Sequence, residues 1–217
     1  MRYAVILPGS GSSVDFITRA YGRPLAEAGY DLQVVPPASD PDGSLAALAE
    51  TAARHRPALV GGVSLGAHLA ARWAAASPAA GVRLLLALPA WTGEPGPVAA
   101  ASAHAAHRVE ALGTPAALAE AARHAEPWVA AELAAAWPAY GATLAATLRA
   151  TAASRGPTVA ELRRIPLPTT VVAFRDDPLH PLAVAQQWAA LIPTATLTTL
   201  ALADPATDRT ILGRAGL

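Results

Sequence analysis

Cysteine and lysine are both missing from this 217-residue chain, and aromatic residues make up only 5% of it. Without cysteine there is no disulfide and no thiolate nucleophile, and a metal site would have to use histidine and carboxylates alone. The 16 basic residues, all arginine, balance 16 acidic ones, which gives a formal net charge of +0. This balance gives no electrostatic reason to expect nucleic acid or an anionic membrane as a partner, so we expect a small neutral or weakly charged ligand.

Long apolar segments are also missing, since no run approaches the roughly 20 residues that span a bilayer. The apolar run at residues 3–7 is too short for a signal peptide and leads into a glycine/serine loop instead of a cleavage site. We therefore expect a cytoplasmic protein with no membrane association. The length and an apolar content of 53% suffice for a single domain, residues 1–217, with a sizeable core.

Short apolar runs alternate with stretches in which apolar residues have helical spacing. This alternation predicts an α/β fold, with a compact parallel sheet of about six strands and helices on both faces. The expected strands are residues 3–7, 32–35, 58–63, 82–88, 170–174 and 196–200, and the expected helices are 14–28, 44–55, 65–76 and 183–191. Residues 90–168 are too long for a simple crossover, so we expect a helical cap or lid of three or four helices there.

The segment from Gly62 to Gly66 reads G-x-S-x-G and lies between an expected strand and an expected helix. Glycines two residues on either side of Ser64 remove side chains that would collide in a tight strand-to-helix turn, and that turn would expose Ser64 Oγ. The Leu65 amide would begin the helix, where unpaired N–H groups and the dipole favour negative charge. The motif predicts a nucleophilic serine at 64 and an oxyanion donor at 65.

A glycine/serine loop, residues 8–13, follows the first strand at the sheet edge where ligand sites gather. With the Ser64 motif, it makes the chain resemble the α/β-hydrolase superfamily over residues 1 to about 200. The resemblance implies that the Ser10 amide is a second oxyanion donor and that Gly9 contacts substrate, with Pro8 where a histidine often precedes the glycine. A phosphate-binding loop is the alternative, but the loop has no arginine or lysine and no G-x-x-x-x-G-K pattern.

The fifth strand runs into Asp176-Asp177-Pro178-Leu179-His180, similar to the turn with which the superfamily often delivers its acid. The resemblance assigns the role of the acid to Asp177, whose carboxylate would orient an imidazole. Asp176 is a close alternative for the same role. The superfamily normally places its histidine after the last strand, yet no histidine follows residue 180. His180, in the same turn as Asp177, is therefore the first candidate for the catalytic base.

The other five histidines have simpler explanations. His68 lies one helical turn after Ser64, and helix geometry directs it along the helix, which favours a structural role. His104, His107 and His124 fall in the cap, and the first two lie three residues apart without a third nearby ligand, so we expect no metal. His55 is expected to interact with a helix C-terminus.

Trp91 directly follows the fourth strand and is expected to line an acyl pocket near Ser64. Together these features predict a serine hydrolase, esterase or thioesterase-like, that cleaves a small ester or thioester through an acyl-enzyme at Ser64 and needs no cofactor. Two alternatives remain open: an acyltransferase that uses the same pocket, and a weak or inactive homologue that binds a small molecule or a partner protein. The segment after the last strand is short, and a homodimer could complete that edge of the sheet.

Overall fold

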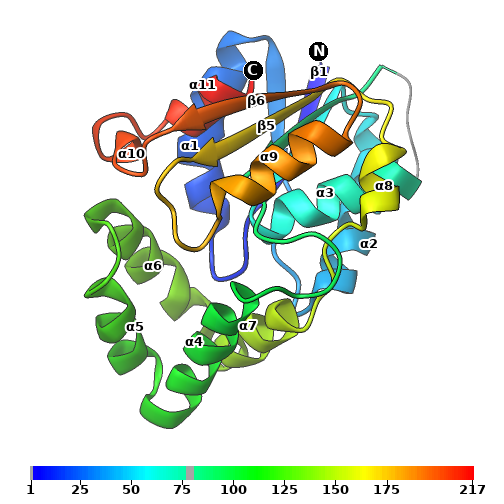
Figure 1. Ribbon diagram of the computed structural model, residues 1–217. Helices are drawn as coiled ribbons and strands as arrows, with labels where there is room; N and C mark the ends of the chain where they lie inside the picture. The colour runs from blue at the N-terminus through cyan, green and yellow to red at the C-terminus, as the bar shows by residue number, and fades with distance from the viewer. Residues whose placement is uncertain (1, 77–80) are drawn as a thin grey trace.

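The computed structural model describes residues 2–76 and 81–217, so Met1 and residues 77–80 of the expected domain lie outside the described residues. Its centre is a six-stranded sheet with the order β2-β1-β3-β4-β5-β6, and every neighbouring pair is parallel. The strands are β1 (Arg2–Leu7), β2 (Tyr30–Val34), β3 (Leu59–Val63), β4 (Arg83–Ala87), β5 (Thr169–Phe174) and β6 (Ala195–Leu200). The predicted α/β class is confirmed (Figure 1).

Helices cover both faces of the sheet (Figure 1). One face carries α1 (Val14–Glu27) and α11 (Ile211–Gly216), whose Ile17, Tyr21 and Leu212 are buried against the strands. The other face carries α2 (Pro41–His55), α3 (Leu65–Ala76), α8 (Val159–Arg163) and α9 (Leu182–Leu191). Because both faces are covered, the central strands are continuous apolar runs instead of alternating ones.

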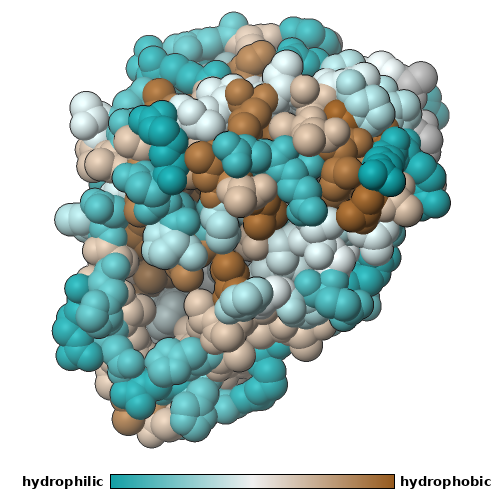
Figure 2. All heavy atoms as spheres, in the orientation of Figure 1, coloured by the Kyte–Doolittle hydropathy of each residue, from teal (hydrophilic) through white to brown (hydrophobic). Residues whose placement is uncertain are grey.

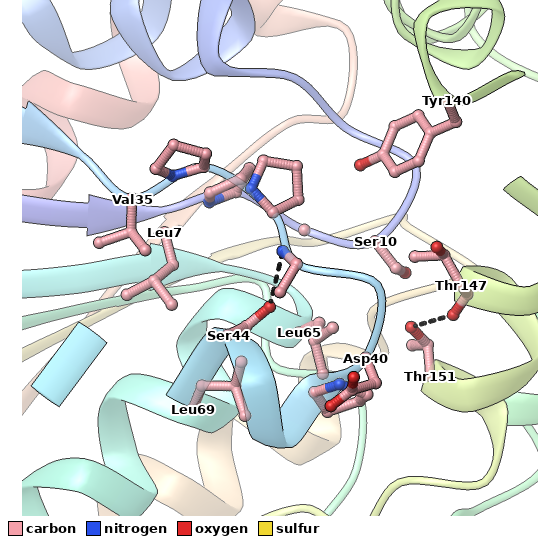
Figure 3. Close-up of a pocket in the computed structure, with 16 residues that line it drawn as sticks. Leu7, Ser10, Val35, Asp40, Ser44, Leu65, Leu69, Tyr140, Thr147 and Thr151 are labelled. Atoms are coloured by element: carbon pink, nitrogen blue, oxygen red, sulfur yellow. Dashed lines mark hydrogen bonds between the residues drawn. The ribbon is translucent and has the colours of Figure 1, made fainter. Parts of the chain in front are cut away.

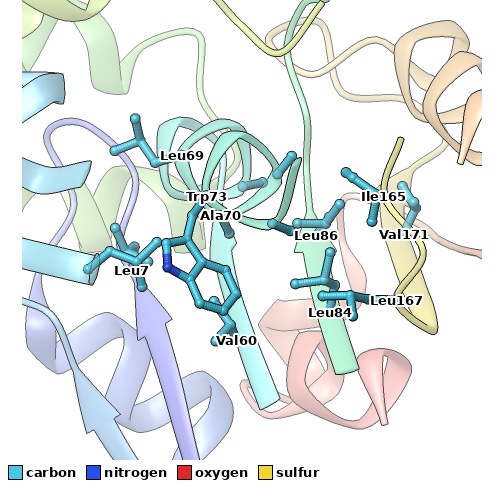
Figure 4. Close-up of a cluster of buried hydrophobic side chains, with 14 of the residues drawn as sticks. Leu7, Val60, Leu69, Ala70, Trp73, Leu84, Leu86, Ile165, Leu167 and Val171 are labelled. Atoms are coloured by element: carbon cyan, nitrogen blue, oxygen red, sulfur yellow. The ribbon is translucent and has the colours of Figure 1, made fainter. Parts of the chain in front are cut away.

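Each face of the sheet has its own hydrophobic core, and the larger of these two lies between α3 and the middle of the sheet. Figure 4 shows Trp73 of α3 packed over Val60 of β3, with Leu84 and Leu86 of β4 beside them. Val60 and Leu86 are completely buried. Buried contacts with the sheet therefore hold α3 from its first turn onward, and with it Ser64, the residue that precedes the helix.

The residues between β4 and β5 form a separate helical cap, drawn in green in Figure 1. It consists of α4 (Ala99–Leu112), α5 (Thr114–Ala122), α6 (Pro127–Tyr140), the 3-10 turn η1 (Gly141–Thr143) and α7 (Leu144–Ala152). Trp137, Leu144 and Leu148 are buried in a small core of the cap's own. The short helix α8 belongs to the same stretch of chain but joins the sheet body, packing with α3 and α9.

The start of one helix differs from the sequence prediction in a way that matters below. Helix α2 begins at Pro41 and not at residue 44, because Asp40 caps it by accepting a hydrogen bond from the Gly43 amide at 2.8 Å. After β6, Asp204 and Pro205 open the short helix α10 (Asp204–Thr207). Proline is tolerated there because the first helical N–H groups have no intrahelical acceptor.

Large apolar side chains at the surface are dispersed over the chain, with Val14, Leu112, Val159 and Leu179 exposed. On the face drawn in Figure 2, apolar side chains are interspersed with hydrophilic ones. Among the described residues, no helix has the length and hydropathy needed to cross a membrane. The homodimer stays a prediction.

Candidate active site

Ser64 lies in the turn between β3 and α3, at the carboxyl edge of the sheet. Its φ of 55° is in the left-handed region, which costs a non-glycine residue roughly 1 kcal/mol or more. The turn is held by the Ser64 amide, which donates to the Ala87 carbonyl at 2.9 Å, and by the Ala67 amide, which donates to the Ser64 carbonyl at 2.9 Å. Ser64 is half-buried as a residue.

The two glycines of the motif are required by close backbone contacts. A Cβ at Gly62 would lie 2.2 Å from the Gly66 carbonyl carbon, and one at Gly66 would lie 2.4 Å from the Leu7 carbonyl oxygen. No side chain is compatible with either distance. The second contact also places the Ser64 turn directly against the end of β1.

Three side chains that the sequence singled out come together in this structure. His180 Nε2 lies 3.0 Å from Ser64 Oγ, and His180 Nδ1 lies 2.7 Å from Asp177 Oδ2. Serine and histidine are 116 positions apart, whereas the histidine and the aspartate belong to one turn. A serine hydroxyl, an imidazole and a carboxylate in this order can pass a proton from the hydroxyl to the ring.

The turn that carries Asp177 and His180 is organised by the carboxylate itself. Asp177 Oδ1 accepts hydrogen bonds from the amides of Leu179 at 2.8 Å and His180 at 3.2 Å, while Oδ2 faces the ring. Burial raises the pKa of Asp177, but the hydrogen bond and charge of His180 and the two amides outweigh burial, so the pKa lies below its usual range. The ionised carboxylate accepts from Nδ1–H, which leaves the lone pair of Nε2 directed at Ser64.

Asp176, the competing carboxylate, has a different partner. Its Oδ1 accepts a hydrogen bond from the Leu202 amide at 2.8 Å, in the loop that follows β6. That loop is where the superfamily places its histidine, and Trp128 of the cap also donates to the Leu202 carbonyl at 2.7 Å. The loop is thus bonded to the neighbouring turn and to the cap, and it contributes no imidazole.

Two backbone amides border the same region. The Leu65 amide lies at the first position of α3, and the Ser10 amide lies in the loop after β1. Within the part of the chain that the structure describes, neither amide donates a hydrogen bond to a protein acceptor. Gly9 lies against the serine, because a Cβ there would be 3.1 Å from Ser64 Cβ. Both amides are available to a bound anion.

A small cavity of about 20 Å³ adjoins these amides, which is space for about one or two water-sized groups. Figure 3 shows Leu7, Val35 and Leu69 on the side of the sheet body, with Tyr140 and Thr147 reaching in from the cap. The complete lining is Leu7, Pro8, Gly9, Ser10, Val35, Pro36, Pro37, Ala38, Asp40, Pro41, Ser44, Leu65, Leu69, Tyr140, Thr147 and Thr151.

Helix α6 of the cap is anchored on both sides of the site. At its C-terminal end, Tyr140 donates from its hydroxyl to the Ser12 carbonyl at 2.7 Å. Near its N-terminal end, the Trp128 indole contacts the rings of Phe16 and Phe174, and Glu132 forms an ion pair with Arg19. The cap is therefore bonded both to the Ser10 loop and to the loop after β6.

His68 and Trp91 lie behind the site, in the core. His68 is completely buried, and its Nε2 accepts hydrogen bonds from the amides of Ala90 at 3.0 Å and Trp91 at 3.4 Å. The two rings meet edge to face with centroids 4.6 Å apart, and the Trp91 indole donates to the Ser154 carbonyl at 3.2 Å. Trp91 is not among the residues that line the cavity, contrary to its expected place in an acyl pocket.

The burial of His68 makes a pH-dependent prediction. Burial, together with the electrostatic influence of His180 and of the Arg72 guanidinium, lowers the pKa of His68 to about 3. The unfolded chain takes up this proton near its ordinary pKa of about 6.5, so it binds more protons than the folded chain between these values. The free energy of unfolding should therefore decrease as the pH is lowered below about 6.5. This group contributes at most about 1.4 kcal/mol to that decrease per pH unit.

Urea unfolding at pH 7, 6 and 5 measures this contribution, with His68→Gln as the variant. Glutamine offers an acceptor but does not titrate, so the variant should lose stability less steeply than the parent. His124→Gln is the control, because His124 is exposed and should leave the slope unchanged. Equal slopes for the parent and His68→Gln would show that His68 does not resist protonation.

The remaining histidines do not join the site. His104 lies in the cap with Nε2 3.6 Å from Glu120 Oε1, and His55 is at the end of α2 with its ring 5.0 Å from that of Tyr3. His107 and His124 are exposed. Within residues 2–76 and 81–217, no group of three or more histidine, aspartate or glutamate side chains is arranged to hold a metal ion.

The structure also adds residues that the sequence analysis missed. Tyr140, Thr147 and Thr151 reach the cavity only through the fold of the cap, and nothing in the local sequence indicates it. Asp40 and Pro41 do carry a signal, since aspartate before proline is typical of a helix start. This signal places the start of α2 at Pro41, on the cavity wall.

Comparison with known proteins agrees with this architecture. No curated protein sequence is significantly similar to the chain. A bromoperoxidase from Bacillus anthracis has 16% identity and a TM-score of 0.76, with 96% of this chain and 88% of that one covered. A thermophilic esterase from Thermogutta terrifontis has 16% identity and a TM-score of 0.70, with 96% and 87% covered.

A hydrolase from Pseudomonas aeruginosa PA01 has 21% identity and a TM-score of 0.70, with 98% of this chain and 88% of that one covered. At these identities the likeness concerns the fold. The sequence itself matches the alpha/beta hydrolase family over residues 2–207, which is nearly the whole chain. The chain is therefore an enzyme of the alpha/beta hydrolase family.

Proposed function

We propose that this enzyme is a serine hydrolase that cleaves small carboxylic esters or thioesters through an acyl-enzyme at Ser64. The observation that carries the proposal is the continuous contact from Ser64 Oγ to His180 Nε2 at 3.0 Å and from His180 Nδ1 to Asp177 Oδ2 at 2.7 Å. A binding protein has no need for a proton acceptor beside a strained serine. The similarity in fold to an esterase from Thermogutta terrifontis is consistent with ester hydrolysis.

In the proposed reaction, Ser64 Oγ attacks the substrate carbonyl carbon while His180 Nε2 accepts the hydroxyl proton. Asp177 keeps the proton on Nδ1 and stabilises the imidazolium that forms. The amides of Leu65 and Ser10 donate to the oxygen of the tetrahedral intermediate, and Gly9 leaves room for it.

Collapse of the intermediate breaks the bond to the leaving group, which takes the proton from His180. A water molecule then attacks the acyl-enzyme, with His180 as base again, and releases the acid and Ser64.

The proposed base differs in origin from the one that the superfamily resemblance implies. Here the acid and the base come from one turn, and the same carboxylate that faces the ring accepts the Leu179 and His180 amides. The loop after β6 contains no histidine, and its Leu202 backbone forms hydrogen bonds with Asp176 and Trp128. One turn thus supplies both the acid and the base, which the superfamily normally takes from the ends of two different strands.

Labelling with a fluorescent fluorophosphonate tests whether Ser64 is activated, since such probes react with serines whose hydroxyl is deprotonated by a neighbouring base. We expect the parent to be labelled, Ser64→Ala to be unlabelled and His180→Ala to react far more slowly. Ser10→Ala is the matched control, because it removes a nearby hydroxyl and retains the backbone amide. Equal labelling of the parent and Ser64→Ala would contradict the proposal.

A further inference from the structure

The cavity beside the two candidate oxyanion amides has walls that fix its size. It borders Gly9, Ser10 and Leu65 but not Ser64, His180 or Asp177. In acyl transfer, the leaving group must lie near the histidine that protonates it, while the carbonyl oxygen lies at the amide donors. Gly9, on the cavity wall, lies against Ser64, since a Cβ there would be 3.1 Å from Ser64 Cβ, whereas His180 is not on the wall. This arrangement favours the acyl side of the scissile bond over the side of the leaving group.

One wall of the cavity comes from the connection between β2 and α2, which contains Pro36 and Pro37, and from Pro41 at the start of α2. Proline fixes its own φ angle and restricts the preceding residue, so this connection has little freedom to move outward. It is also braced by hydrogen bonds, from the Val35 amide to the Ile6 carbonyl at 3.0 Å and from the Ala38 amide to Ser44 Oγ at 3.1 Å.

The opposite wall belongs to the cap and is polar. Tyr140 is bonded to the Ser12 carbonyl, and the Thr151 hydroxyl donates to the Thr147 carbonyl at 3.0 Å, as Figure 3 shows for the two threonines. These hydroxyls already donate to carbonyl groups, and Thr147 and Thr151 are buried, so they are held in place. The far wall therefore limits the length of an acyl chain by its position.

From this geometry we infer that the enzyme selects short acyl groups of two or three carbons, with the methyl of an acetyl group or the ethyl of a propionyl group in this cavity. The inference rests on the proposed function, because it places the carbonyl at Ser64. A volume of about 20 Å³ accommodates about one or two small groups beyond the carbonyl carbon. Leu69 of α3 lines the cavity and is 1% exposed, so shortening its side chain should enlarge the cavity.

Hydrolysis of p-nitrophenyl acetate, propionate, butyrate and hexanoate tests the inference, with the background rate subtracted. For the parent, kcat/KM should fall by about tenfold or more between propionate and hexanoate, since a filled pocket discriminates strongly against added methylenes. Leu69→Ala should raise the ratio of hexanoate to acetate turnover by about tenfold. Val35→Ala, a smaller truncation of another lining residue, should raise it less and protects the test if Leu69→Ala fails to fold.

Leu162→Ala is the matched control, because Leu162 is completely buried in the same core but does not line the cavity. It should lower stability and leave the ratio unchanged. Ser64-dependent turnover that is equal for acetate and hexanoate, or a ratio that Leu69→Ala and Val35→Ala leave at the parental value, would overturn the inference alone. Absence of Ser64-dependent turnover on every ester would overturn the proposed function and the inference with it.

Discussion

Replacing His180 by alanine is expected to lower kcat for ester hydrolysis by about four to six orders of magnitude, with little change in stability. The reason is local: Nε2 lies 3.0 Å from Ser64 Oγ, and none of the other histidines joins this site. Without the ring, the serine hydroxyl has no group to accept its proton, and only the backbone amides remain to favour the transition state. Steady-state kinetics with p-nitrophenyl acetate and a thermal unfolding curve measure both effects.

His124→Ala is the control for this variant. His124 is exposed in the cap, so its removal should leave kcat within a factor of about two, as expected for a surface substitution outside the site. A His180→Ala enzyme with parental turnover would exclude His180 as the base. A loss of turnover in both variants would indicate instead that the cap tolerates little change.

Replacing Asp177 by asparagine is expected to lower kcat by roughly 10⁴-fold, as for an acid that orients the catalytic imidazole. Asp177 Oδ2 accepts the Nδ1 proton at 2.7 Å, which leaves Nε2 free to accept from Ser64. An asparagine amide group can donate to Nδ1 and so stabilise the other tautomer, with the proton on Nε2. The ring would then face the serine with a donor in place of an acceptor.

Asp176→Asn provides the matched comparison, one position away in the same turn. Asp176 accepts a hydrogen bond from the Leu202 amide, and an asparagine side-chain oxygen can accept the same bond, so we expect kcat within a few-fold of the parent. The pair of variants separates the two carboxylates that the sequence left in competition. The reverse result, with Asp176→Asn inactive and Asp177→Asn active, would assign the acid to Asp176.

Much of this fold is predictable because its signals are local. The strands and sheet helices follow from apolar runs and helical spacing, and the G-x-S-x-G segment is required by contacts as short as 2.2 Å at Gly62. His180 is predictable as a candidate because it lies three positions after Asp177, so its place beside that carboxylate depends on one turn and not on the whole fold. The geometry of that turn is set by one carboxylate and two nearby amides.

What could not be predicted depends on how the cap meets the sheet body. Tyr140 and Thr147 reach the cavity across contacts of more than a hundred positions, such as the hydrogen bond from Tyr140 to the Ser12 carbonyl. Trp91 follows the fourth strand, which predicts a place at the substrate, yet its side chain packs edge-on against His68. Position along the chain placed that residue at the correct edge of the sheet but did not determine which way its ring points.

Hydrolysis of p-nitrophenyl acetate by the parent and by Ser64→Ala, at matched concentrations and with the spontaneous rate subtracted, tests the central claim most directly. Ser64 is the one side chain that the proposed reaction modifies covalently, and its hydroxyl oxygen lies 3.0 Å from His180 Nε2. The account predicts turnover by the parent and a loss of at least about 10⁴-fold in the folded variant. Turnover that persists in Ser64→Ala, or a parent that does not hydrolyse any of the short esters, would contradict it.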